Sequence, residues 1–176
     1  MPQNSEKRRT KWYEKVLKCL TENPTKSPHQ MAKDLGTYRQ LIWRMRRNLE
    51  KDKVIWGYTA VVDERKLNHV MYVILMKLGP MTRDLAQLII ERMVTRAPNK
   101  QNVRLLNVLY VNGEFDLLVM FTAPDHASAR RYFDSLRIAY KDFLVERPII
   151  VDVNFPIIRE GKVNPELKKL HDFVPM

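Results

Sequence analysis

Two runs of β-favouring residues, VRLLNVLYV and EFDLLVMFT, flank Asn112-Gly113 and constrain the fold of this chain more than any other feature. Branched and aromatic residues dominate both runs and favour extended strands. Asn-Gly is the preferred pair for a type I′ turn between antiparallel strands. The sequence therefore predicts a tight hairpin over 103–122, and any fold that contains it must include an antiparallel sheet.

The segments around this hairpin add alternating strands and helices. We expect an apolar strand at 70–78, a helix at 81–96, a second helix at 125–143 and a last strand at 147–157. The order βαββαβ is that of the ferredoxin-like split unit, in which helices cover one face of an antiparallel sheet. The fold class is thus α+β over 70–157.

Apolar residues recur at helical spacing in both expected helices and mark the faces that should pack on the sheet. These residues are Leu85, Leu88, Ile89 and Met93 in the first helix, and Ala129, Tyr132, Phe133, Leu136 and Tyr140 in the second. The strands at 70–78 and 115–121 do not alternate with polar residues, so their second face also needs a cover. We expect that cover to be the same sheet of another copy, which predicts a homodimer.

Three helices are expected ahead of this domain. They span 10–22, 28–35 and a segment beginning near Thr37, and Gly36 closes the second one. Two helices joined by a tight turn that contains Gly form a helix-turn-helix. We expect Thr37 to cap the third helix, with Gln40 completing a capping box. KVIWGYTAVVD (53–63) is expected to form a strand, either a wing or the exit from the module.

The third helix carries an unusual concentration of arginine, TYRQLIWRMRRNLEKDK (37–53). At about 100° per residue, an apolar seam faces the core and a second stripe faces away from it. The seam is Ile42, Met45 and Leu49, and the outward stripe is Gln40, Trp43, Arg44 and Arg47. The plainest interpretation of such a stripe is a solvated cationic face.

The charge of the chain is distributed unevenly. The formal net charge is +11, and residues 1–57 hold 14 Lys and Arg against 6 Asp and Glu. Most of the excess lies in the first third, which includes a basic arm at 1–9. This asymmetry indicates an N-terminal module that meets a polyanion, joined to a nearly neutral remainder.

The composition excludes several other functions. Cys19 is the only cysteine and the four histidines are scattered, so we expect no disulfide, metal site or cofactor. Five glycines form no phosphate-binding loop, and no run approaches the roughly eighteen apolar residues that span a bilayer. The start lacks a signal-peptide core. We expect a non-enzymatic, cytoplasmic and nucleoid-associated protein.

Taken together, these features resemble the Lrp/AsnC family of transcriptional regulators over roughly residues 10–157. Three segments carry the resemblance: the frame from Leu35-Gly36 through Leu49 to Val54-Ile55, the exit segment GYTAVVD (57–63), and NGEFDLLV (112–119), which is similar to the family's Gly-x-aromatic-Asp hairpin. The resemblance implies a winged helix-turn-helix at 10–57, a connecting segment at 58–69, and a dimerisation and effector domain at 70–157. It leaves 158–176 as a tail with a helix expected from Pro165.

The resemblance also implies that the third helix enters the major groove of double-stranded DNA. Gln40, Arg44 and Arg47 have side chains suited to base edges, and Trp43 either contacts a thymine methyl or the backbone, or caps the edge of the core. The expected phosphate contacts are Arg39, Arg46, His29, Lys33 and Lys51. The functional prediction is a sequence-specific regulator that binds as a dimer or a higher oligomer such as a tetramer or octamer.

In this family small molecules, often amino acids, bind near the hairpin. The resemblance therefore points to Asn112, Gly113, Glu114 and Asp116 as an effector site, although the same residues could form nothing more than a turn. Three other functions stay open. One is a tetrapyrrole enzyme resembling sirohaem decarboxylases, with His126, Arg130 and Arg131 as its candidates. The others are a non-specific DNA-coating protein and, less favoured because the strands lack the aromatic motif, an RNA-binding protein.

Overall fold

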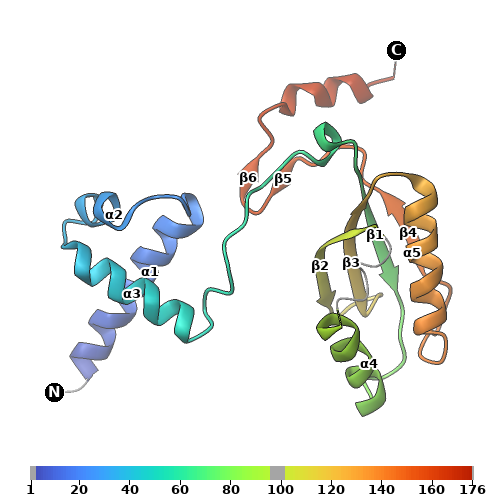
Figure 1. Ribbon diagram of the computed structural model, residues 1–176, viewed down its shortest axis with the longest axis horizontal. Coiled ribbons are helices and arrows are strands. Elements are labelled where there is room, and N and C mark those ends of the chain that lie inside the picture. The colour runs from blue at the N-terminus through green and yellow to red at the C-terminus, as the bar shows by residue number, and fades with distance from the viewer. Residues whose placement is uncertain (1–2, 96–101, 176) are drawn as a thin grey trace. The chain divides into compact units, whose positions relative to one another are not determined.

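The computed structural model describes residues 3–95 and 102–175 and divides into two compact units (Figure 1). The helical unit extends to Val61 and also contains Ile157–Leu167 from the other end of the chain. The α/β unit contains Val62–Pro156 and the tail from Lys168 onward. Each unit has an apolar core of its own.

Three helices build the helical unit: α1 (Gln3–Glu22), α2 (Pro28–Asp34) and α3 (Arg39–Lys51). Their apolar faces meet in one core, which confirms the expected seam of α3. The buried side chains are Val16, Leu20, Met31, Ala32, Leu41, Ile42, Met45 and Leu49. Burial of a side chain the size of Leu or Ile stabilises the folded unit by about 1.5–3 kcal/mol.

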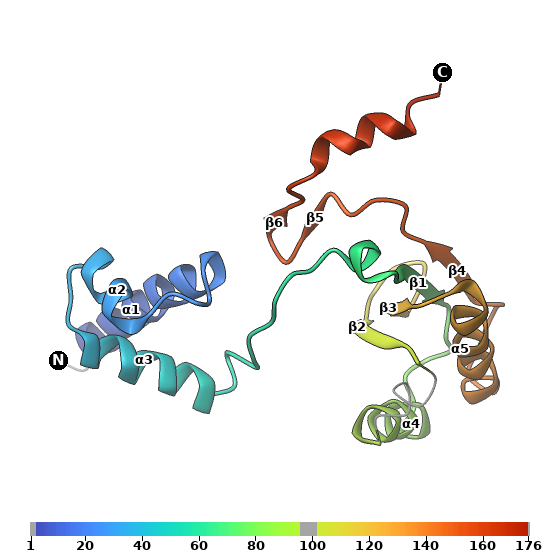
Figure 2. The same cartoon turned by 45° about the horizontal axis from the view of Figure 1, so that its top comes forward.

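Two expectations for this unit are wrong. The helix α1 begins at Gln3 and not at residue 10, so the part of the basic arm at 3–9 continues the helix; residues 1–2 lie outside the described part of the chain. No strand forms over 53–63, although the segment is rich in Val, Tyr and Trp. A strand needs a neighbour to accept its backbone hydrogen bonds, and this segment runs extended without entering a sheet (Figure 2).

A small hairpin from the C-terminal tail completes the helical unit. Strands β5 (Ile158–Arg159) and β6 (Lys162–Val163) pair around Glu160 and Gly161, whose φ values are 47° and 72°. Two residues with positive φ between paired strands form a type I′ turn. The ammonium of Lys162 donates hydrogen bonds to the carbonyl oxygens of Thr21, at 3.1 Å, and Glu22. These carbonyls end α1, where a cation is favoured.

The α/β unit has the expected ferredoxin-like order. A short 3-10 helix η1 (Glu64–Leu67) leads into β1 (Val70–Met76), α4 (Arg83–Val94), β2 (Arg104–Tyr110), β3 (Leu117–Ala123), α5 (His126–Ala139) and β4 (Ile149–Asp152). The antiparallel sheet has the order β2-β3-β1-β4. The last strand is shorter than the expected 147–157, and the tail helix expected from Pro165 is a 3-10 helix, η3 (Leu167–Phe173).

One face of the sheet and the two helices share the second core. Tyr72, Ile74 and Phe121 from the strands are buried against Tyr132 and Phe133 of α5. All five residues expected on the inner face of 125–143 are buried, as is Leu85 of α4. Leu88 and Ile89 pack partly against this core, whereas Met93 is 37% exposed, so its expected inward position is wrong.

The turn between β2 and β3 differs from the expected one. Residues 111–116 form a six-residue loop, and neither Asn112 nor Gly113 has the positive φ that a type I′ turn requires. Asp116 explains the longer loop: its amide donates to the Met76 carbonyl and its carboxylate accepts from the Leu78 amide at 2.8 Å. Both contacts draw the loop toward the end of β1.

The second face of the sheet is apolar, as the strand pattern predicted. Paired residues of antiparallel strands share a face, which places Val73 beside Met120 and Val151, and Leu75 beside Leu118 and Ile149. None of these six belongs to the helix-side core of the described chain. Ile149 and Val151 of the edge strand are 46% and 43% exposed.

Candidate nucleic-acid interface

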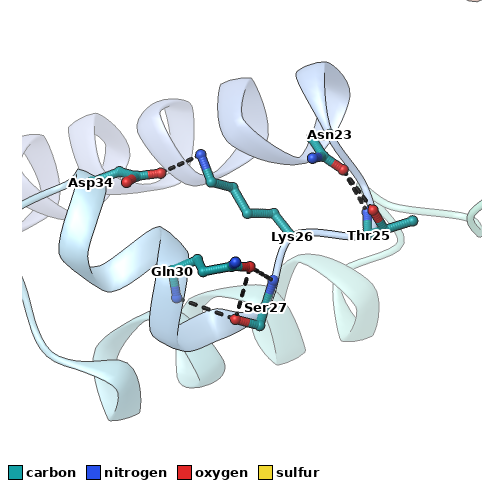
Figure 3. Close-up of polar contacts among 6 residues, drawn as sticks. All are labelled: Asn23, Thr25, Lys26, Ser27, Gln30 and Asp34. Atoms are coloured by element: carbon teal, nitrogen blue, oxygen red, sulfur yellow. Dashed lines mark hydrogen bonds and ion pairs between the residues drawn. The ribbon is translucent and has the colours of Figure 1, made fainter.

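The turns on either side of α2 fix the angle at which α3 is presented. Ser27 caps α2 by accepting the Gln30 amide at 3.2 Å, and the Gln30 side chain accepts the Ser27 amide at 3.1 Å, which is a capping box (Figure 3). Ahead of it, the Asn23 side chain accepts the amide and the hydroxyl of Thr25, and Lys26 pairs with Asp34 (Figure 3). The entry into the helix-turn-helix is therefore held by side chains as well as by the core.

The turn from α2 to α3 is closed by Gly36. Its φ of +62° lets the Thr37 amide reach the Ala32 carbonyl at 2.9 Å, while its own amide reaches the Lys33 carbonyl. This pattern is a Schellman motif. It uses Thr37 in the turn, so Tyr38 becomes the N-cap of α3, and Tyr38 makes no capping bond with its side chain. The capping box expected at Thr37 and Gln40 is thus wrong; the capping box of this unit lies at Ser27 and Gln30.

The outward stripe of α3 is where the sequence placed it. Gln40, Trp43, Arg44 and Arg47 are all exposed, on the side of the helix opposite the buried seam. Arg44 and Arg47 make no ion pair within the described part of the chain, and the Arg47 guanidinium lies 5.2 Å from the centre of the Trp43 ring. Trp43 is 54% exposed and is not among the side chains that pack against the helical core.

Arg46 differs from the other arginines of the helix. Its Nε donates to Glu50 at 3.1 Å, and its guanidinium stacks on the ring of Tyr58 at 4.5 Å. The Tyr58 hydroxyl donates to the same Glu50 oxygen at 2.9 Å. The Arg46 guanidinium, assisted by that hydroxyl, holds the pKa of Glu50 below its usual value. Arg46 is therefore partly neutralised, and Tyr58 is a residue of this surface that the sequence did not reveal.

The remaining cations expected near DNA border the stripe. Arg39 and Lys51 lie at the two ends of α3, and His29 and Lys33 lie on α2; all four are exposed. The turn at Gly36 connects the two helices that carry them. The short helix α2, the tight turn at Gly36 and the exposed basic helix α3 together have the geometry of a helix-turn-helix.

The expected effector residues lie in the other unit, on the loop between β2 and β3. Asn112, Gly113 and Glu114 are exposed, and Gly113 has open space around its Cα. Asp116 is half-buried, and one of its oxygens is bound to the Leu78 amide. The loop therefore holds Asp116 in a structural role already, while its exposed part keeps backbone amides and the Asn112 side chain accessible.

The residues considered for tetrapyrrole chemistry are engaged in local contacts. His126 Nδ1 lies 2.8 Å from the Tyr72 hydroxyl, Arg130 pairs with Asp134, and Arg131 donates to the Ser128 hydroxyl. Across residues 3–95 and 102–175, no group of three or more His, Cys, Asp or Glu side chains could hold a metal ion. No helix among the same residues is long and apolar enough to cross a membrane.

Comparison with known proteins finds its matches among solved structures. No family model and no curated protein matches the chain. The crystal structure of PH0061 superposes with a TM-score of 0.68 at 21% identity, covering 82% of this chain and 91% of that chain. An AsnC family transcriptional regulator from Agrobacterium tumefaciens gives 0.63 at 18% identity, covering 88% and 95%.

A third similar structure is the complex of the transcriptional regulator NMB0573 with L-Met, from Neisseria meningitidis. Its TM-score is 0.60 at 16% identity, and the match covers 82% of this chain and 89% of that chain. The matched structures are mostly regulators of one family, and the match extends over both units. The protein therefore has the fold of the Lrp/AsnC transcriptional regulators, a helix-turn-helix followed by a ferredoxin-like domain.

Proposed function

We propose that the protein is a transcriptional regulator that binds double-stranded DNA by placing α3 in the major groove. The observation that carries the proposal is the stripe of Gln40, Arg44 and Arg47, which is exposed, lacks ion pairs among the described residues, and lies opposite a buried seam. An α-helix fits the major groove, Arg pairs bidentately with guanine, and Gln pairs with adenine. Arg39, Lys51, His29 and Lys33 are placed to contact phosphates on either side.

The proposed assembly is a dimer formed by the open face of the sheet. This face presents Val73, Leu75, Leu118 and Met120 at its centre, and Ile149 and Val151 at its edge. An apolar surface of this kind is stabilised by contact with another apolar surface, and a two-fold axis would supply an identical one. Two copies of α3 would then meet half-sites about one helical turn, roughly 34 Å, apart.

An amino-acid-like effector at the loop 111–116 is part of the proposal. Its support is the exposure of Asn112, Gly113 and Glu114, together with the L-Met complex of a protein with this fold. Because Asp116 already accepts the Leu78 amide, we assign the carboxylate of an effector to the loop amides and Asn112, and give Asp116 the role of holding the loop. Isothermal calorimetry with the free amino acids tests this part: the absence of heat from every one of them leaves the loop as a turn only.

Selection from random duplexes tests the function as a whole. Purified full-length protein is used at about 0.2 M salt, which suppresses purely electrostatic binding. Enrichment of a pseudo-palindrome with half-sites near one turn apart is the expected result. Binding without enrichment that vanishes as salt rises identifies instead the second candidate, a non-specific DNA-coating protein, which the net charge of +11 also favours.

Substitution of the stripe tests the assignment of the residues. Arg44→Ala and Arg47→Ala are each expected to weaken specific binding by roughly 1–3 kcal/mol, because each removes a bidentate contact to a base. The same substitution at Lys141, an exposed cation of the α/β unit, is the matched control and should leave the affinity unchanged. Equal affinity of all three variants for the selected duplex, measured by fluorescence anisotropy, would falsify the assignment.

A further inference from the structure

Trp56 is the most exposed large apolar side chain of the described residues. It is 95% exposed, whereas Trp43 on α3 is 54% exposed and Trp12 packs against the core of the helical unit. A tryptophan left in water forgoes the largest apolar burial that any side chain offers. The position does not need an aromatic residue for packing, so a function outside the unit is the simplest account of it.

The backbone on the N-terminal side of Trp56 is fixed to α3. The helix ends at Lys51, and two residues later the φ of 56° at Lys53 turns the chain back. The amides of Val54 and Ile55 then both donate to the Leu49 carbonyl, at 2.9 and 3.1 Å. The Ile55 side chain packs against the helical core. The residue directly before Trp56 is therefore anchored by its backbone and its side chain.

The chain on the C-terminal side is fixed as well. Tyr58 donates its hydroxyl to Glu50 at 2.9 Å, and its ring lies under the Arg46 guanidinium. Residues 55 and 58 are thus two attachment points on α3, and Trp56 lies between them. A segment held in this way presents its side chain with little conformational freedom left to lose on binding.

The attachment also decides on which side of α3 the segment runs. At about 100° per residue, Arg46 and Glu50 lie roughly 90–130° from the centre of the stripe of Gln40, Arg44 and Arg47, on the side toward Trp43, and roughly 70–110° from the centre of the buried seam. The segment with Trp56 therefore runs along the flank of α3, between the stripe and the buried seam. If the stripe faces the major groove, a segment flanking it faces the sugar-phosphate backbone and the adjacent minor groove.

We infer that Trp56 is a second DNA contact, which inserts its ring into the minor groove at the edge of the half-site bound by α3. The inference rests on the proposed function and adds a contact that the basic stripe does not supply. Apolar side chains that enter the minor groove unstack a base step and bend the duplex. Lys51 and Lys53, two exposed cations shortly before Trp56 in the chain, favour DNA over an apolar protein partner.

The test compares full-length Trp56→Ala, Trp56→Phe and the wild type on the selected duplex, or on a mixed-sequence duplex of about four helical turns if none is selected. Affinity is measured by anisotropy, and bending by energy transfer between end labels. Trp56→Ala should weaken binding at least about tenfold and reduce the bend, and Trp56→Phe should retain part of both. Netropsin, which occupies the minor groove, should lower the affinity of the wild type more than that of Trp56→Ala.

Three outcomes separate this inference from the proposed function. Affinity and bending within about twofold of wild type for Trp56→Ala overturn the inference. So does a change in oligomeric state on size-exclusion chromatography, which would place Trp56 between two copies of the chain. If Arg44→Ala and Arg47→Ala also bind normally, the proposed function fails too; if they lose affinity while Trp56→Ala does not, only the inference fails. Ile138→Ala, which removes another exposed apolar side chain, is the matched control.

Discussion

The two units differ in how their surface cations are paired and in how their apolar surface is covered. The helical unit gathers apolar side chains of its three helices in one core and leaves Arg44 and Arg47 of α3 without ion pairs among the described residues. The α/β unit pairs many of its surface cations, including Arg130 and Arg137 with Asp134, Lys77 with Glu146, and Arg104 with the buried Glu64. The same unit leaves one face of its sheet apolar.

This contrast indicates the chemistry of the partner that each unit lacks. Unpaired arginines on a helix are stabilised by a polyanion, because phosphates release counterions when they meet them. An apolar sheet face is stabilised by another apolar surface, which removes it from water. In the proposed function the two units bind different partners, so a substitution in one should leave the binding of the other largely intact.

The largest effect is expected from a charge in the centre of the open sheet face. Leu118 lies between Leu75 and Leu109 on that face, so Leu118→Lys would bury an unpaired ammonium in the proposed dimer. We expect the dimer to weaken by roughly 3 kcal/mol or more, over a hundredfold, as measured by sedimentation equilibrium. Ile138→Lys on the exposed side of α5 is the control. A Leu118→Lys protein that sediments like the wild type would show that this face has no partner.

The next effect concerns the pH dependence of the α/β unit. Burial raises the pKa of Tyr132 to about 12, above the value of 10 for a free tyrosine, because the core disfavours the phenolate. The unfolded chain then ionises first, so the contribution is fully present below pH 10 and is lost as the pH rises toward 12. Over that window the unit should lose roughly 2–3 kcal/mol of unfolding free energy.

Urea denaturation at pH 9 and pH 11.5, values chosen on either side of roughly pH 10, measures this loss. Tyr132→Phe should be less sensitive to alkali than the wild type, whereas Tyr110→Phe, at an exposed position, should not differ from it. All three tryptophans lie in the helical unit, so their fluorescence follows that unit while circular dichroism follows both. If the unfolding free energy measured by tryptophan fluorescence falls equally at alkaline pH, the loss of stability does not belong to the α/β unit.

The smallest effect concerns the two ends of the helix-turn-helix. Gly36 and Lys53 occupy equivalent positions after α2 and α3, with φ of 62° and 56°. A residue with a Cβ is strained there, by about 1 kcal/mol, so Lys53→Gly should stabilise the helical unit by that amount and Gly36→Ala should destabilise it similarly. Thermal unfolding followed by tryptophan fluorescence gives both changes. Shifts of the same sign in the two variants would exclude backbone strain as their cause.

Sequence periodicity predicted the elements that bury one face. The seam of α3, the inner face of α5 and the βαββαβ order all follow from the spacing of apolar residues, and the structure has each of them. The exposed stripe of α3 followed from the same spacing, since a helix with one buried side must expose the other. These predictions succeeded because burial of a repeating face is a local property of the sequence.

The predictions that failed depended on contacts made at a distance. Asn112-Gly113 favours a type I′ turn, but hydrogen bonds from Asp116 to β1 impose a longer loop. The type I′ turn lies instead at Glu160-Gly161, where the sequence has no long β-favouring runs that would have predicted a hairpin. Thr37 and Gln40 match a capping box, yet the Thr37 amide closes α2. Nothing in the local sequence shows that Tyr58 binds Glu50, because the partners are eight residues apart around a turn.

The hydrogen bonds of Lys162 with the end of α1 have a consequence for the synthesis of the protein. Lys162 follows Glu22 by 140 residues, so Lys162 is made long after Glu22. The three helices can gather their core as soon as they leave the ribosome, since domains generally fold as they emerge. The carbonyls of Thr21 and Glu22 at the end of α1, however, lack the hydrogen bonds from Lys162 until the α/β unit has also been made. A nascent chain halted before residue 157 should therefore hold a helical unit whose first helix frays at its C-terminal end, and emergence of the hairpin of β5 and β6 is the step that closes it.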